Sequence, residues 1–142
     1  MDVSEADLVG TWRLVRYDFV GPDGTARPRW PEGASGLLHY GADRRMSAHL
    51  AAEGRPATGD DMAAVAPETA LAAMRGYTAY AGRWSLEGGR VRHDVEIALR
   101  PEWRGRTLWR AATLADGVLR LVAEGAWRDS AQGRAELDWV KI

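Results

Sequence analysis

The sequence predicts an all-β protein, an eight-stranded up-and-down antiparallel barrel with one short helix between strands three and four. Two of the observations behind this prediction are the hairpin loops Gly88-Gly89 and Asp116-Gly117, each flanked by two strand-like runs. The third is that the other alternating runs are short and follow one another with only turn residues between them. Such strands close most economically into a barrel, because closure leaves no unpaired edge. A sandwich of two sheets is the competing architecture.

The composition favours one cytoplasmic domain over residues 1–142. The 19 Lys and Arg residues balance 20 Asp and Glu residues, so the charge predicts no binding of nucleic acid or of an anionic membrane surface. Without cysteine there is neither a disulfide framework nor thiolate chemistry. The polar N-terminus and the lack of a long apolar run predict neither a signal peptide nor a membrane span.

The first part of the chain supplies three strands. The first is Gly10–Phe19, and its apolar residues change face after Leu14, which indicates a β-bulge or a change of the buried face. The second and third strands are expected over 36–40 and 45–50, joined by a turn over 41–44.

One helix is expected over Pro67–Arg75. It has a proline near its first position, Glu68 in its first turn and Gly76 just beyond its end, which are the signals of a helix start and stop. Its apolar side is narrow and consists of Leu71 and Met74. We therefore expect it to brace one end of the barrel or to cover its mouth.

The hairpin over residues 77–99 has one apolar and one charged face. The Gly-Gly loop fixes the register, and a shift of one residue would mix the two faces. The pairs expected on the apolar face are Leu86 with Val91, Trp84 with His93, Gly82 with Val95 and Tyr80 with Ile97. Those expected on the other face are Glu87 with Arg90, Arg83 with Asp94 and Ala81 with Glu96. The apolar face should be a buried wall that includes His93.

The second hairpin joins residues 106–115 to 118–124 and places a charge on an apolar face. Its register pairs Leu114 with Leu119, Ala112 with Leu121 and Arg110 with Ala123. Arg110 is therefore expected to point inward, whereas Trp109 is expected to point outward. The last strand, over 135–140, has Leu137 and Trp139 on one face.

Several short segments occur in a characteristic order along the chain. They are Gly10-Thr11-Trp12, Gly36-Leu37-Leu38-His39-Tyr40, Met46-Ser47-Ala48, Tyr80-Ala81-Gly82-Arg83-Trp84, His93-Asp94-Val95-Glu96, Pro101-Glu102-Trp103-Arg104-Gly105 and Leu137-x-Trp139. In this order they resemble the bacterial and fungal lipocalin-like domain family of small, eight-stranded, calycin-type barrels. The resemblance covers nearly the whole chain and implies a barrel that holds a hydrophobic small molecule.

The same resemblance suggests a setting. Similar small barrels are found with natural-product pathways, where some cyclise or rearrange a bound intermediate. The chain lacks the cysteines and the Thr-Asp-Tyr segment of secreted lipocalins. A role as a secreted carrier is therefore not expected.

His93 is the main candidate for chemistry, since an imidazole can exchange protons near neutral pH. On its apolar face it is either a core histidine that is hydrogen-bonded to a neighbour, or a polar anchor or acid–base group for a ligand. Tyr80, on the same face, either donates a hydrogen bond or simply packs. For Arg110 the alternatives are a structural ion pair, a different register, or an anchor for a carboxylate, an enolate or a carbonyl oxygen.

The histidines do not predict a metal site. If the turn over 41–44 pairs Tyr40 with Arg45, His39 faces Met46, and His49 points the other way. Without cysteine and without a closely spaced pair of histidines, no zinc ligand set is present. The sequence also lacks a phosphate-binding loop, a dinucleotide fingerprint and a nucleophile motif, so no cofactor is predicted.

The sequence therefore predicts a binding module for a hydrophobic, partly polar small molecule. One alternative is a cofactor-independent cyclase or isomerase of natural-product biosynthesis that uses the same interior, and another is a structural protein with a filled barrel. The candidate catalytic residues are His93 and Tyr80. The candidate ligand-binding residues are Trp84, Arg110, His39, Met46, Trp103 and Trp139. Trp109, on the outer face, marks a candidate homodimer contact.

Overall fold

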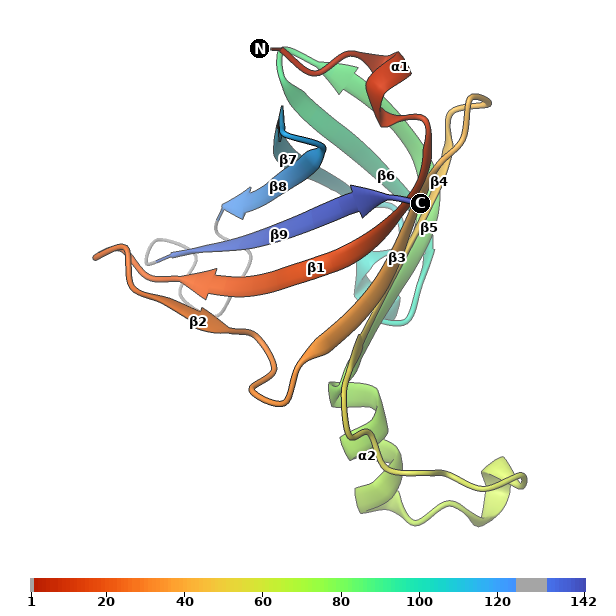
Figure 1. The fold of residues 1–142 in the computed structure, drawn as a ribbon. Helices are drawn as coiled ribbons and strands as arrows, with labels where there is room; N and C mark the ends of the chain where they lie inside the picture. The colour runs from red at the N-terminus through yellow and green to blue at the C-terminus, as the bar shows by residue number, and fades with distance from the viewer. Residues whose placement is uncertain (1, 125–132) are drawn as a thin grey trace.

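A computed structural model describes residues 2–124 and 133–142 of the chain. Their nine strands form one antiparallel sheet in the order β2-β1-β3-β4-β5-β6-β7-β8-β9, and β1 also pairs with β9 (Figure 1). All strands but β2 therefore form a closed eight-stranded barrel, as the sequence predicts, and the sandwich alternative is wrong. The elements are α1 (Glu5–Leu8), β1 (Gly10–Val20), β2 (Ala26–Pro28), β3 (Ala34–Tyr40), β4 (Arg45–Ala52), η1 (Met62–Ala64), α2 (Pro67–Arg75), β5 (Tyr77–Glu87), β6 (Arg90–Ala98), η2 (Pro101–Trp103), β7 (Thr107–Ala115), β8 (Val118–Glu124) and β9 (Arg134–Lys141).

The short strand β2 is an addition to the barrel that the sequence did not predict. It pairs with the last residues of β1, from Asp18 to Val20. Because β2 takes a place in the numbering, the predicted helix α2 lies between β4 and β5 rather than between β3 and β4. The strands that flank it are nevertheless the third and fourth strands of the closed barrel.

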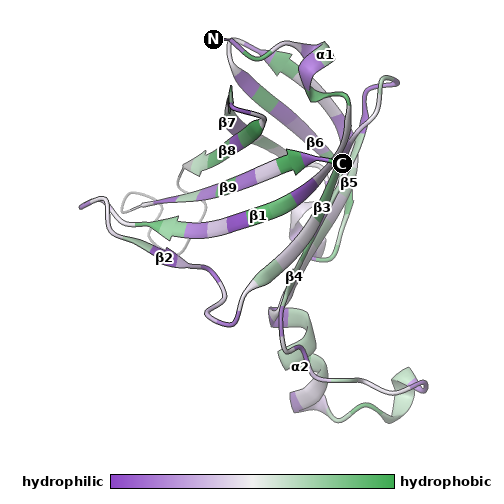
Figure 2. Ribbon diagram, viewed as in Figure 1, coloured by the Kyte–Doolittle hydropathy of each residue, from purple (hydrophilic) through white to green (hydrophobic). Residues whose placement is uncertain are grey.

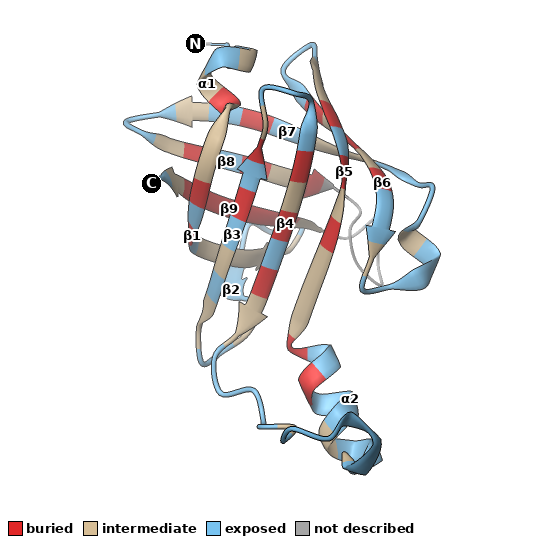
Figure 3. Cartoon of the chain, turned by 90° about the vertical axis from the view of Figure 1, so that its right-hand side faces the viewer, coloured by how far each residue is buried: buried red, intermediate tan, exposed pale blue. Residues whose placement is uncertain are grey.

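The side chains alternate between the interior and the outer surface along most strands. Figure 2 shows this alternation as bands of hydrophobic and hydrophilic residues along β1, and Figure 3 shows the buried positions recurring along β4. Closure directs one face of every strand into a common core. The most deeply buried large side chains are Trp12, Trp139, Tyr40, Leu8, Leu38, Leu119, His93 and Val91.

One end of the barrel is closed by α1 and by the first residues of β1. Ser4 caps α1, because its hydroxyl accepts a hydrogen bond from the backbone N–H of Asp7 at 3.2 Å. The Trp12 indole donates to the carbonyl oxygen of Leu8 at 2.9 Å, and both side chains are almost fully buried. A tryptophan can fill this end of the core because its one polar group finds an acceptor there.

The β5–β6 hairpin has the predicted register near its loop and departs from it at its far end. Trp84 lies opposite His93 and Gly82 opposite Val95, as predicted, but Tyr80 lies opposite Ala98 instead of Ile97. The physical reason is a bulge, since the register shifts between Ala81 and Gly82. The same shift pairs Ala81 with Ile97 instead of Glu96, and Ile97 is 68% exposed.

Gly82 is the residue that permits this bulge. A Cβ atom at this position would lie 1.9 Å from the carbonyl oxygen of Asp94, a separation that real atoms do not reach. Only a glycine therefore lets β5 approach β6 so closely.

The predicted register of the β3–β4 hairpin is wrong by one residue. Tyr40 pairs with Met46 and His39 with Ser47. The loop is shorter than predicted, because Gly41 donates its N–H to the carbonyl oxygen of Arg45, and Arg44 adopts a left-handed conformation with φ 68°. The shift turns Tyr40 and Met46 into the core and leaves His39 exposed on the outer surface.

The β7–β8 hairpin confirms its predicted register. Leu114 pairs with Leu119 and Ala112 with Leu121, and the Asp116-Gly117 loop has the positive φ angles of a type I′ turn. On the other side of β7, Arg110 lies opposite Val91, which is fully buried. Arg110 therefore belongs to the inward face of the barrel, as predicted.

The bulge predicted in β1 is confirmed and changes which residues face the core. The pairing of β1 with β9 shifts between Leu14 and Arg16. Val15 is left 54% exposed, and Tyr17 then lies opposite Leu137, a residue of the inward face of β9. Both Leu14 and Tyr17 can therefore point inward although three positions separate them.

Helix α2 has the predicted bounds but not a buried apolar side. Its N-terminal proline and the Gly76 C-cap are in the expected places. Figures 1 and 3 show the helix beyond the ends of β4 and β5 rather than across the barrel. Leu71 and Met74 are 47% and 46% exposed, so about half of the face that was expected to brace the barrel lies in solvent.

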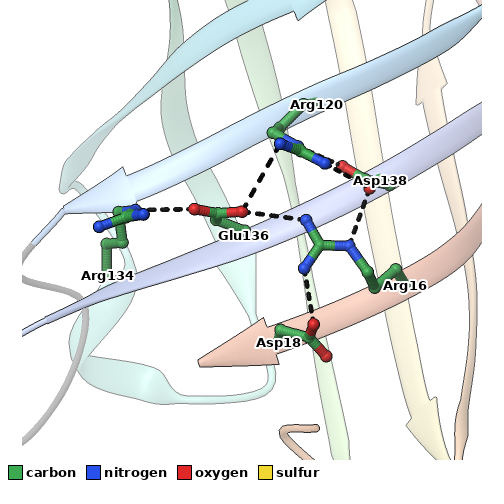
Figure 4. Close-up of polar contacts among 6 residues, drawn as sticks. All are labelled: Arg16, Asp18, Arg120, Arg134, Glu136 and Asp138. Atoms are coloured by element: carbon green, nitrogen blue, oxygen red, sulfur yellow. Dashed lines mark hydrogen bonds and ion pairs between the residues drawn. The ribbon is translucent and has the colours of Figure 1, made fainter. Parts of the chain in front are cut away.

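The outer face of β1, β8 and β9 carries an ion-pair network that the sequence did not predict (Figure 4). Arg16 lies between three acids, with nitrogen–oxygen distances of 2.6 Å to Asp18, 3.0 Å to Glu136 and 2.8 Å to Asp138. The second guanidinium on Asp138 is that of Arg120, at 2.8 Å, and its hydrogen bond is the main cause that lowers the pKa of this carboxyl group. The network joins the first strand of the barrel to the last.

We expect Asp138→Ala to lower the free energy of unfolding by about 3 kcal/mol, because it leaves two arginines without their shared acceptor in a half-buried site. The matched control is Glu102→Ala, which removes an exposed ion pair with Arg100 and should cost less than about 0.5 kcal/mol. Urea denaturation of both variants measures the difference. Equal stabilities would show that the network does not hold β1 and β9 together.

Candidate functional site

A chain of three polar side chains crosses the interior of the barrel. The Tyr40 hydroxyl lies 2.7 Å from Nε2 of His93, and the Tyr80 hydroxyl lies 2.8 Å from Nδ1 of the same ring. Tyr40, Tyr80 and His93 are 0%, 7% and 1% exposed. Both ring nitrogens of this histidine are therefore hydrogen-bonded away from water. We call these three residues the Tyr–His–Tyr chain.

Three different strands bring the Tyr–His–Tyr chain together. His93 lies on β6 between Val91 and Val95, which are also buried, so the alternation of the strand alone directs it inward. Tyr80 comes from β5 and Tyr40 from the corrected register of β3. The rings of both tyrosines stand 5.6 Å from the His93 ring, at tilted angles that suit packed aromatic groups.

All three residues of the chain are uncharged near neutral pH. Burial lowers the pKa of His93 well below its usual value, and the positive charge of Arg110 lowers it further. Burial also raises the pKa of Tyr40 and of Tyr80. A neutral imidazole has one donor and one acceptor nitrogen, so one tyrosine donates to it and the other accepts from it. The tyrosine that accepts keeps its own hydroxyl proton for another acceptor.

Arg110 lies beside the Tyr–His–Tyr chain. Its guanidinium lowers the pKa of Tyr80 by its charge and by a hydrogen bond, although burial outweighs both. It also acts on Tyr40 and on Tyr17 through its charge. Its Nη1 donates to the carbonyl oxygen of Trp109 at 3.0 Å. The inward position of Arg110 thus places a positive charge next to three phenolic groups.

Tryptophan rings pack around these polar groups. The Trp103 ring packs edge-on against Tyr80 with a centroid distance of 5.7 Å, and the Trp30 ring packs edge-on against Tyr17 at 5.5 Å. The Trp84 indole donates to the carbonyl oxygen of Gly41 at 2.9 Å. Trp30 and Trp103 precede β3 and β7, so both come from connections between strands.

Trp139 differs from the other interior tryptophans in its hydrogen bonding. It is 2% exposed and lies opposite Leu14 and Leu119. Its Nε1 is buried, and no acceptor for it lies within the described part of the chain. A buried donor without an acceptor is costly, so this nitrogen can be satisfied by a group that enters the barrel.

Most of the predicted site residues share the interior, and one does not. His93, Tyr80 and Arg110 contact or act on one another, and the predicted apolar residues Trp84, Met46, Trp103 and Trp139 all pack in the core or against it. His39 was expected beside Met46, but it lies on the outer surface, where its Nδ1 is 3.2 Å from the Thr11 hydroxyl. The reason is the short β3–β4 loop.

Tyr40 and Tyr17 are site residues that the sequence analysis missed. Tyr40 was assigned to the wrong face by the β3–β4 register, and a three-residue loop over 42–44 would have placed it correctly. Tyr17 was placed on the face opposite Leu14, and only the position of the β1 bulge turns it inward. Trp127, which was not assigned a place, lies outside the described residues.

The comparison with protein families agrees with this geometry. A family model described as a lipocalin-like domain matches residues 9–142. The chain belongs to the lipocalin-like domain family. A comparison with curated proteins finds no match. A lipocalin-like barrel fits the binding of a ligand in general, and this directs attention to the interior of the barrel.

The surface of the lipocalin-like barrel offers no competing site with comparable chemistry among the described residues. One hollow lies outside the wall beside η2 and is lined by Ile97, Ala98, Pro101 and two charged side chains, and another lies at the turn between β1 and β2. Neither includes the Tyr–His–Tyr chain. Residues 2–124 and 133–142 contain no group of three potential metal ligands and no helix long and apolar enough to cross a membrane.

The depressed pKa of His93 makes the stability of the lipocalin-like barrel depend on pH. The unfolded chain takes up a proton near pH 6.5, whereas the folded chain does so only at lower pH. The stabilisation by neutral His93 is therefore complete above about pH 7 and falls as the pH drops below 6.5. The slope approaches about 1.4 kcal/mol per pH unit.

Urea denaturation between about pH 7.5 and pH 5 measures this slope. His93→Gln, which keeps one donor and one acceptor, should lack the His93 contribution to this slope. Identical slopes for the variant and the wild type would contradict the assignment of a neutral, buried His93.

Proposed function

We propose that the barrel binds a hydrophobic small molecule with one polar end, which the Tyr–His–Tyr chain and Arg110 orient. The observation that carries this proposal is that both ring nitrogens of His93 bond buried tyrosine hydroxyls. The tyrosine that accepts from a neutral imidazole then keeps its own hydroxyl proton for a further acceptor. Ligand sites in general combine a mostly apolar lining with a few converging polar groups. The apolar lining would come from Trp84, Met46, Trp103 and Trp139.

Entry of a ligand requires aromatic side chains at the polar end to move. Trp103 is the side chain that packs on Tyr80, and it comes from the short connection between β6 and β7. A ligand that reaches the Tyr80 hydroxyl would replace the contact between these two rings. The fluorescence of this tryptophan would change as a consequence.

PRODAN, a neutral naphthyl ketone, is a suitable probe because its emission reports both an apolar environment and a hydrogen bond to its carbonyl oxygen. We expect the wild-type protein to bind it with a blue shift relative to water. Tyr80→Phe removes the hydroxyl and should weaken binding about fivefold, the worth of one hydrogen bond. Fluorescence titration measures the affinity.

The matched control for this variant is Tyr77→Phe. The Tyr77 hydroxyl is also hydrogen-bonded to a histidine, His49, at 2.7 Å, but this pair lies on the outer side of β4 and β5. The control should bind PRODAN as the wild type does. Emission that stays as in water for the wild-type protein would refute binding in the barrel.

A cofactor-independent cyclase or isomerase remains the alternative proposal, and the continuity of the Tyr–His–Tyr chain favours it. A phenol–imidazole–phenol chain can pass a proton from one end to the other, and a bound, oriented carbonyl is where such a proton would be used. The same PRODAN complex separates the two functions. An enzyme of this kind should speed the exchange of hydrogens next to the bound carbonyl in heavy water, and Tyr80→Phe should abolish this, whereas a binding module should show no exchange above the free ketone.

A further inference from the structure

The formal charges that the described residues place inside the barrel are of one sign. Arg110 points inward from β7, and its charge acts on Tyr40, Tyr80 and His93. Tyr17 is influenced by the charges of Arg110 and of Arg29, and both lower its pKa, although burial raises it more. The groups that act on this part of the interior are therefore cationic or neutral.

The buried acidic side chains of the described residues are on the other side of the wall. Of the described acids, only Glu136 and Asp138 are buried, and both alternate with the inward-facing Leu137 and Trp139 along β9. They are held by the ion-pair network on the outer face (Figure 4). No ion pair among the described residues includes Arg110. The barrel wall thus separates the acids from this cation.

The neutral groups inside the barrel do not balance that charge. His93 uses both of its ring nitrogens on tyrosines. Arg110 has five N–H donors, and its partners in the described chain are the Trp109 carbonyl oxygen and the Tyr80 hydroxyl. The buried Nε1 of Trp139 is a further donor, for which the described chain supplies no acceptor. Among the described residues, the interior therefore has a surplus of donors and a half-buried positive charge without a counter-ion.

We propose that the ligand carries a carboxylate at its polar end and that Arg110 binds it. A planar carboxylate accepts two parallel N–H bonds from a guanidinium, and such charge-assisted bonds are about twice as strong as neutral ones. A half-buried guanidinium without an acid partner is costly, so an anionic ligand at Arg110 would offset this cost. This inference rests on the proposed binding function and specifies the chemical class of the ligand.

Decanoate and decanol form a matched pair of probes for this inference, since they share an apolar chain and differ in the charge of the head group. Isothermal titration calorimetry at about pH 7.5 measures the affinity of each. We expect the wild-type protein to bind decanoate at least about tenfold more tightly than decanol. The Arg110→Gln variant should lose this preference, because its affinity for decanoate falls much more than its affinity for decanol.

The control variant is Arg92→Gln. Arg92 lies on the neighbouring strand, opposite Trp109, and forms an exposed ion pair with Asp94 on the outer face. The Arg92→Gln substitution removes the same charge from the other side of the wall, so the preference for decanoate should persist. Loss of the preference in both variants would mean that net charge, and not a site at Arg110, selects the anion, and would overturn the inference.

The outcomes separate this inference from the proposed function. If neither probe binds to the wild-type protein, the proposed function falls and this inference falls with it. If both bind with equal affinity, the binding function stands and the carboxylate assignment is wrong. Should Arg110→Gln fail to fold, the ratio of the wild-type affinities for decanoate and decanol decides between these results. Arg110→Lys keeps the charge without the planar guanidinium and should retain part of the preference for decanoate.

Discussion

The hydrogen bonds between β1 and β9 are the constraint on which the rest of the molecule depends. They turn a meander of strands into a closed barrel, so each strand has one face inside and one outside. A polar side chain that falls on the inner face then finds a partner inside or stays unsatisfied. His93 finds two partners, whereas the Nε1 of Trp139 finds none among the described residues. Closure therefore explains both the hydrogen-bonded Tyr–His–Tyr chain and the buried donor of Trp139 that has no acceptor among the described residues.

The parts of the fold that depend on short loops could be predicted from the sequence. Gly88-Gly89 and Asp116-Gly117 fix the register of their hairpins because two-residue loops allow few backbone geometries. The β3–β4 register was wrong because Arg44 adopts a left-handed conformation that its residue type does not signal. The predicted pairing of Ile97 with Tyr80 was wrong because a bulge depends on contacts of Gly82 across the strands. Local sequence determines a loop more directly than it determines a bulge.

The residues of the candidate site also divide into those that could be predicted from the sequence and those that could not. His93 and Arg110 could be predicted to face inward because the predicted hairpin registers hold near the two loops, and Tyr80 because it alternates with Trp84 along β5. The inward position of Tyr40 could not be predicted, since it depends on the β3–β4 loop, whose predicted length was wrong. The ion-pair network could not be predicted either, because Arg16 and Asp138 become neighbours only after the first and last strands have met. Long-range pairing of this kind leaves no periodic signal in the sequence.

The central claim is that His93 is a neutral imidazole held in one tautomer between two tyrosines. Nitrogen-15 NMR of histidine-labelled protein tests it most directly, because protonated and unprotonated ring nitrogens have well-separated chemical shifts. We expect one His93 nitrogen to remain protonated and the other unprotonated from about pH 8 down to about pH 5.5, with no titration in this range, since burial depresses its pKa. A His93 ring whose two nitrogen shifts are averaged and titrate near 6.5 would contradict the Tyr–His–Tyr chain and the ligand site built on it.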